Sequence, residues 1–211
     1  LLLMLDYGIF YEFMPMSEYG KESPKTLQLD GVKIGENYAL IISTNGGLWR
    51  YLIGDTVQFT TLNPYRIKVS GRTKHYINAF GEELIVENAD QAIGIASQKS
   101  GSIVKEYSAA PKYMDENGAG AHEWVIEFEQ EPSDLEYFAE MLDNALKNVN
   151  SDYEAKRYHD KVLKLPIINK VPVGTFYRWM KHNGKLGGQH KVPRLSNNRD
   201  YIDEILKYQH A

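Results

Sequence analysis

The chain has 211 residues, of which 43% are hydrophobic, enough for one large domain or two small ones with real cores. Its formal net charge of −4 at pH 7 argues against a general nucleic-acid binder, and no run of about 18 apolar residues is present to span a membrane. The absence of cysteine excludes disulfides and thiolate catalysis, and we expect a cytoplasmic protein.

Residues 1–70 have the composition of an all-β region. Runs rich in β-branched and aromatic residues, separated by Gly, Asn and Pro, predict strands in "GIFYEFMP", "YALIIST", "LWRYLI", "TVQFTTL" and "YRIKVS". Their spacing predicts a small barrel or a sandwich, and of the two we expect a small β-barrel subdomain. The first residues are apolar but lack a Met start and the features of a signal peptide, so we expect this region to be truncated at its amino terminus.

The pattern changes near Gly71, and residues 71–211 predict an α+β lobe. "SGR" joins the two patterns with a glycine, which marks a candidate hinge. Helices are expected at 87–98, 133–149, 151–159, 174–184 and 199–209, and strands at 75–80, 102–110, 122–129 and 162–171.

Two helix starts carry an S-x-x-E capping box. Ser133 and Glu136 form the first box, and Ser151 and Glu154 form the second. Trp49 and Trp124 lie in strand-like runs, and we expect both in the core. The six histidines have no ligand spacing for zinc, so no metal site is predicted.

The stretch "RYLIGDTVQF" places Gly54 and Asp55 between two strand-like runs. One interpretation is a hairpin turn, since Gly and Asp are both common turn residues. The other is a fixed carboxylate that accepts two hydroxyl groups, such as those of a ribose diol. The pair alone leaves both open; combined with the motif that follows, it favours a turn whose carboxylate meets a ribose.

The following segment, "GRTKHYINAFGEEL", joins this pair in a larger pattern. Together the two stretches resemble the Y-x-x-G-D and G-R-x-(D/K)-x-I-x-x-x-G-E motifs of the adenylate-forming superfamily, which holds the acyl-CoA synthetases and luciferases. The matching residues are Tyr51, Gly54, Asp55, Gly71, Arg72, Lys74, Ile77, Gly81 and Glu82.

Further stretches narrow the branch. "LDYGIFYEFMPMSE", "LPIINKVPVGTF" and "GGQHKVPR" are similar to the carboxy-terminal portion of the plant auxin-inducible acyl-acid amido synthetases and their bacterial relatives. The last stretch resembles the Q-(Y/F)-K-x-P-R context of this branch's active-site lysine. Lys191 is that lysine here, and His190 replaces the usual aromatic residue.

The resemblance implies an ATP-dependent acid–amine ligase that uses Mg²⁺, forms an acyl-adenylate and transfers it to an amino acid, releasing AMP. It implies a catalytic role for Lys191, which would contact carboxylate and phosphate oxygens during adenylation. For the other residues it implies nucleotide binding by Asp55, Arg72 and Tyr51, a hinge at Lys74, and a loop for amide formation at Phe80, Gly81 and Glu82. The alternative for Lys191 is an ordinary surface lysine without a catalytic role. For Arg194 we expect a structural role.

Two motifs of the superfamily are missing from the chain. Neither the Ser/Thr/Gly-rich phosphate-binding loop nor the Y-x-x-(S/T)-E motif occurs, so the chain by itself should not adenylate anything. We therefore expect a fragment whose partners are a missing amino-terminal lobe and small carboxylic acid and amino acid substrates. The alternative is a free-standing, non-catalytic binding module that reuses the small lobe.

Overall fold

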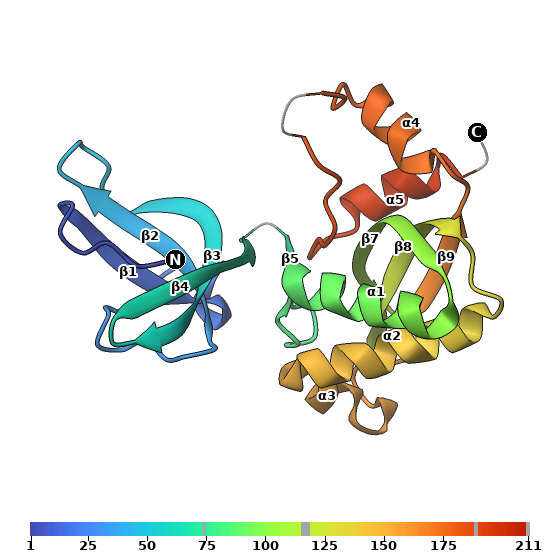
Figure 1. Ribbon diagram of the computed structural model, residues 1–211, viewed down its shortest axis with the longest axis horizontal. Helices are drawn as coiled ribbons and strands as arrows, with labels where there is room; N and C mark the ends of the chain where they lie inside the picture. The colour runs from blue at the N-terminus through green and yellow to red at the C-terminus, as the bar shows by residue number, and fades with distance from the viewer. Residues whose placement is uncertain (74, 115–118, 188–189, 210–211) are drawn as a thin grey trace. The chain divides into compact units, whose positions relative to one another are not determined.

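The computed structural model describes residues 1–73, 75–114, 119–187 and 190–209 (Figure 1). The chain divides into two compact units, a first unit of Leu1–Lys74 and a second unit of His75–Ala211. No helix among the described residues combines the length and the apolar character needed to cross a membrane.

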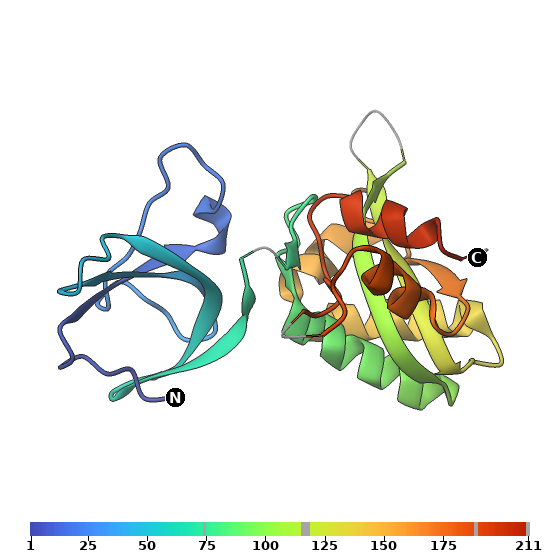
Figure 2. The ribbon, with the colours of Figure 1, turned by 90° about the horizontal axis from the view of Figure 1, so that it is seen from above.

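The first unit is one antiparallel sheet. Its strands follow the order β1-β2-β3-β4, and the long connection after β1 carries the short helix η1 and projects from the sheet (Figure 2). These elements are β1 (Ile9–Pro15), η1 (Met16–Glu18), β2 (Asn37–Thr44), β3 (Tyr51–Leu62) and β4 (Tyr65–Arg72). The predicted small β-barrel is not shown: within the described residues the sheet is open, with β1 and β4 at its edges.

The number of strands also differs from the prediction, because two expected strands are one. "LWRYLI" and "TVQFTTL" merge into β3, and the hairpin turn expected at Gly54-Asp55 is absent. A step of two residues along β2, from Ala39 to Ile41, is matched by a step of four along β3, from Thr56 to Leu52. The extra residues form a β-bulge, where the left-handed φ of +91° at Gly54 lets the strand bend and continue.

Aromatic rings fill the core of the first unit. The centroids of Phe13 and Phe59 are 4.9 Å apart, and Tyr38 packs edge-on against both. Trp49, in contrast, is 79% exposed, which corrects its predicted place in the core. It precedes β3 in the connection from β2, where no strand alternation turns its side chain inward.

The second unit is a three-layer arrangement around a small sheet. Strand β8 (Gly120–Gln130) lies in the centre, antiparallel to β7 (Ile103–Tyr113) and parallel to β9 (Ile167–Val171). Helices α1 (Val86–Ser100) and α2 (Leu135–Val149) cover one face, and α4 (Thr175–His182) and α5 (Asp200–Leu206) cover the other (Figure 1).

The side chains of β8 alternate between the two helix-covered faces of the sheet. Trp124 and Ile126 pack toward α1 and α2, whereas Val125 between them packs toward α4 and α5. The strand is therefore buried on both sides from Gly120 to Phe128, although it carries the polar residues His122, Glu123 and Glu127. The prediction that Trp124 belongs to the core is confirmed, since it is fully buried.

Both predicted capping boxes are shifted by one residue. Asp134 caps α2, because its Oδ1 accepts the N–H groups of Glu136 at 2.9 Å and Tyr137 at 3.1 Å. Asn150 caps α3 (Ser151–Arg157) in the same way, accepting the N–H of Tyr153 at 2.8 Å. Asp, Asn and Ser are about equally good caps, so the cap is the residue that stands directly before the first helical residue.

The remaining elements are a short 3-10 helix and two short strands that border the candidate site. A short turn of 3-10 helix, η2 (Tyr158–Asp160), follows α3. Two-residue strands β5 (Tyr76–Ile77) and β6 (Leu84–Ile85) pair antiparallel and enclose a loop at 78–83. This loop contains the Phe80, Gly81 and Glu82 of the superfamily motif.

Candidate functional site

Asp55 and Arg72 lie opposite each other on neighbouring strands. They are register partners on β3 and β4, and Arg72 Nε is 3.4 Å from Asp55 Oδ1. The side chains are 38% and 70% exposed, respectively. An exposed ion pair contributes about 1 kcal/mol or less to stability, so both groups remain available to a ligand at little energetic cost.

The bulge in β3 places this pair at the end of the β3–β4 ladder. The N–H of Thr73 donates to the carbonyl of Gly54 at 2.9 Å, one step past the Asp55–Arg72 pair. The folding of the hairpin thus joins two motif residues that are far apart in sequence. Tyr51 lies at the start of β3 and is about half exposed. Lys74, the predicted hinge, lies outside the described residues.

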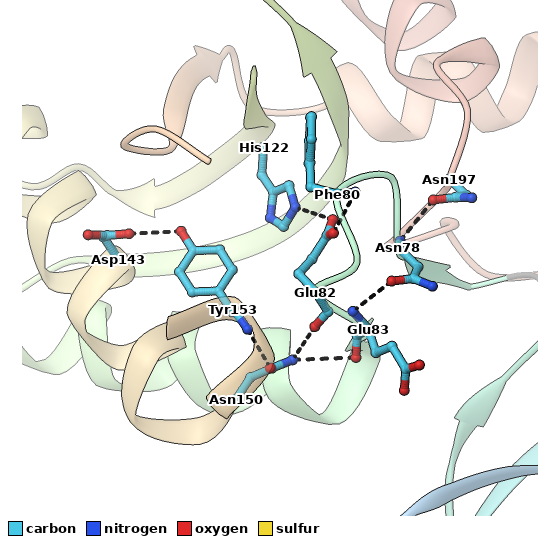
Figure 3. A network of polar contacts seen from close by, with 9 residues as sticks. All are labelled: Asn78, Phe80, Glu82, Glu83, His122, Asp143, Asn150, Tyr153 and Asn197. Atoms are coloured by element: carbon cyan, nitrogen blue, oxygen red, sulfur yellow. Dashed lines mark hydrogen bonds and ion pairs between the residues drawn. The ribbon is translucent and has the colours of Figure 1, made fainter. Parts of the chain in front are cut away.

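The loop at 78–83 is held from within by the Glu82 side chain (Figure 3). Glu82 Oε2 accepts the N–H of Phe80 at 2.7 Å, and its Oε1 lies 2.8 Å from His122 Nε2. Both side chains of the Glu82–His122 pair have 0% exposure. The carboxylate therefore supports the turn from inside, whereas Gly81, with φ of +84°, forms its bend.

Backbone groups of the loop are held by asparagine side chains. Asn150 donates through Nδ2 to the carbonyls of Glu82 at 2.9 Å and Glu83 at 3.4 Å, while its Oδ1 caps α3. Asn78 accepts the N–H of Glu83 at 3.1 Å, and its own N–H donates to Asn197 Oδ1 at 2.8 Å (Figure 3). The loop is thus fixed to both α3 and the carboxy-terminal segment.

A buried polar cluster is joined to Asn150 through Tyr153, whose N–H donates to Asn150 Oδ1. Tyr153 donates from its hydroxyl to Asp143 Oδ1 at 2.8 Å, and Arg157 makes two contacts to the same carboxylate at 2.6 and 3.0 Å. Burial favours the neutral form of Asp143, but the hydrogen bonds from Arg157, Lys147 and Tyr153 outweigh it, so its pKa is lowered. Burial and the Asp143 charge together raise the pKa of Tyr153 well above its ordinary value.

The segment that carries Lys191 is fastened to the edge of β7. Ser108 donates from Oγ to the carbonyl of Pro193 at 2.7 Å, and Ala109 exchanges backbone hydrogen bonds with Arg194 and Ser196. Lys191 itself is exposed and has no hydrogen bond or ion pair within the described ranges. Its ammonium group is free to meet a ligand.

Arg194 has a different environment from that of Lys191. Its guanidinium contacts Asp90 at 2.6 Å and Glu106 at 3.4 Å and lies over the ring of Tyr107. These contacts agree with the structural role predicted for Arg194. In the part of the chain that the structure describes, no group of three His, Asp or Glu side chains could hold a metal ion.

Sequence reasoning missed the residues that support the loop. His122 is 40 residues from Glu82, and Asn197 is 119 residues from Asn78, so no local spacing links these partners. Only Asn150 carried a usable signal, because an Asn directly before a helical pattern is a preferred cap.

Comparisons with known proteins identify two family domains in the chain. Residues 2–72 match the GH3 family central domain, and residues 87–200 match the GH3 family C-terminal domain. The indole-3-acetic acid-amido synthetase GH3.3 of Arabidopsis thaliana is 27% identical over 199 residues, covering 88% of this chain. The chain spans about a third of that relative's length.

Solved structures share the fold. The GH3.15 acyl acid amido synthetase superposes with a TM-score of 0.65 at 21% identity, over 96% of this chain and 36% of that one. A 2-hydroxyisobutyryl-CoA ligase in the postadenylation state superposes with a TM-score of 0.50 at 14% identity, over 97% and 39%. These findings confirm the resemblance predicted from the sequence motifs. The chain therefore belongs to the GH3 family, with its first unit matching the central domain and its second unit the C-terminal domain.

Proposed function

We propose that this chain is the carboxy-terminal part of an ATP-dependent ligase that activates a carboxylic acid as an acyl-adenylate and transfers it to an amino acid. The observation that carries the proposal is the pairing of Asp55 with Arg72, two motif residues brought together on neighbouring strands with accessible side chains. The relative GH3.3 is named as an amido synthetase, which supports the same reaction class.

The nucleotide half of the proposed site lies on β3 and β4. The ionised carboxylate of Asp55 is an acceptor suited to the two hydroxyls of a ribose. Arg72 and Tyr51 border the same nucleotide, and Lys74 serves as the hinge on which the second unit swings. Mg²⁺ accompanies ATP in this proposal, but we assign it no ligand in this chain, because no suitable group of side chains occurs among the described residues.

Lys191 is proposed to act in the first half-reaction. An attacking carboxylate and the α-phosphate of ATP repel each other, so a cation between them stabilises the crowded negative charge. A lysine on a mobile lobe delivers this charge for adenylation and leaves for the second half-reaction. The turn of Phe80, Gly81 and Glu82 then faces the site while the amine displaces AMP.

ATP–pyrophosphate exchange tests the proposal directly. The full-length protein should show exchange that depends on a carboxylic acid, when tested against a mixed panel of acids. The 211-residue chain alone should show none, because an amino-terminal lobe would supply the phosphate-binding loop and the acid pocket. A full-length protein without exchange for any acid would favour a non-catalytic binding module instead.

Replacing Lys191 with alanine should slow adenylation in the full-length protein by at least about tenfold, or about 1.4 kcal/mol of transition-state stabilisation. The attack of the amine on a preformed adenylate should be unchanged, because the lysine has then left the site. Exchange and single-turnover amide formation measure the two steps. The control is Lys181→Ala, which removes an exposed lysine of α4. An unchanged exchange rate in Lys191→Ala would rule out the assigned role.

Replacing Asp55 with alanine should raise the KM for ATP about tenfold to a hundredfold, since hydrogen bonds to a charged group contribute about 1.5–3 kcal/mol. Stability should fall by less than about 1 kcal/mol, because the ion pair with Arg72 is exposed. Steady-state kinetics and urea unfolding measure the two effects. Thr60→Ala, at an exposed position of the same strand, should change neither. An unaltered KM for ATP would count against nucleotide binding by Asp55.

A further inference from the structure

His122 makes a buried contact that has no role in the reaction proposed above. It lies on β8, fully buried, with Nε2 2.8 Å from Glu82 Oε1. Its ring is packed between aromatic neighbours, with centroids 6.3 Å from Phe80 and 5.5 Å from Tyr153. No described residue is a hydrogen-bond partner of its Nδ1, so Glu82 is the one polar group that the imidazole meets among the described residues.

The contact continues through Glu82 into the backbone of the loop. While one carboxylate oxygen meets His122, the other accepts the N–H of Phe80, so a single side chain connects β8 to the turn (Figure 3). A carboxylate held at both oxygens in a dry environment has little freedom to rotate. The imidazole therefore fixes the Glu82 carboxylate and, through it, the Phe80 N–H, in addition to the contacts that Asn150 and Asn78 make to the loop backbone.

Stability alone is a weak explanation for this pair. Buried polar or charged pairs can often be replaced by apolar side chains with little loss of stability, whereas removing one partner leaves the other unsatisfied. What an apolar pair could not supply is a defined conformation for a turn whose bend depends on a left-handed glycine, Gly81.

We infer that His122 is a positioning residue for amide formation, holding Glu82 so that the Phe80–Gly81–Glu82 turn meets the acyl-adenylate in one conformation. The inference rests on the proposed function, because it concerns the second half-reaction of that ligase. His122 touches neither substrate in this scheme; it acts through the Glu82 carboxylate and the Phe80 N–H.

The test compares the two half-reactions in His122→Leu of the full-length protein. Acid-dependent ATP–pyrophosphate exchange should stay within about twofold of wild type, while single-turnover amide formation from the adenylate should slow by at least about tenfold. His122→Gln should restore most of the rate, because its amide nitrogen can reach the position of Nε2. Val125→Ala, on the other face of the same strand, controls for a loss of packing and should not separate the two steps.

Hydrogen exchange provides a readout that needs no activity. The Phe80 amide should be protected in the wild type and in His122→Gln but exposed in His122→Leu, with protection of the central strand unchanged. Equal slowing of both half-reactions in His122→Leu, or full protection of the Phe80 amide in it, would overturn the inference. A wild-type protein that lacks acid-dependent exchange would overturn the proposed function, and the protection pattern then decides the His122 contact on its own.

Discussion

Replacing Asp143 with alanine should lower the free energy of unfolding by about 3–5 kcal/mol, because the change leaves the buried Arg157 guanidinium without its carboxylate partner. Arg157 would keep its contact to the carbonyl of Leu163 at 2.7 Å but lose two short contacts to Asp143. Tyr153 would lose the acceptor of its hydroxyl group. Urea unfolding of the second unit measures the loss.

The same variant should change how stability depends on pH. The pKa of Asp143 is lower in the folded protein than in the unfolded chain, so its contribution is present above the unfolded pKa and is lost as the pH falls through the folded pKa. Wild-type stability should therefore fall more steeply than that of Asp143→Ala as the pH decreases below about 5. The difference between the two curves isolates Asp143 from the other carboxylates.

A second substitution separates an unpaired charge from a packing defect. Asp143→Ala combined with Arg157→Leu should recover part of the lost stability, because the double variant no longer buries a lone cation. If Asp143→Ala alone unfolds within about 1 kcal/mol of wild type, the cluster does not stabilise the fold as its geometry implies.

Replacing Gly120 with alanine should destabilise the second unit by about 2–4 kcal/mol, through overpacking at the start of β8. A Cβ at this position would overlap with the carbonyl oxygen of Lys112 and lie 2.6 Å from Cζ of Phe80. The first neighbour is backbone of the paired strand β7 and cannot move away without disturbing the ladder. The second neighbour, Phe80, is part of the loop at 78–83, so amide formation should slow as well.

Gly94 supplies the matched control for this substitution. It lies within α1, and a Cβ there would meet nothing within 4 Å. Gly94→Ala should raise the free energy of unfolding by up to about 1 kcal/mol, because alanine is a better helix former than glycine. Denaturant curves of the two variants should thus shift in opposite directions. A Gly120→Ala protein as stable as wild type would contradict the close approach of Phe80.

Local patterns in the sequence were enough to predict most elements of the second unit and the family. The helix α2 follows from apolar residues recurring at helical spacing, because that spacing itself records which face is buried. The stretches "LDYGIFYEFMPMSE", "LPIINKVPVGTF" and "GGQHKVPR" identified the family, because residue types and spacing can be read without knowledge of the fold.

Other features were decided only by the tertiary structure. Whether Gly54 makes a turn or a bulge depends on the register with β2, which the residues of β3 do not contain. Asp134, one residue after the expected Ser133, caps α2 because packing sets where the helix begins.

The support of the candidate site illustrates the same limit. His122 and Glu82 are in contact although 40 residues separate them. No sequence pattern near either residue indicates its partner. Local periodicity determines which segments become helices and strands; the partners of a buried polar group are determined when distant segments exclude water together.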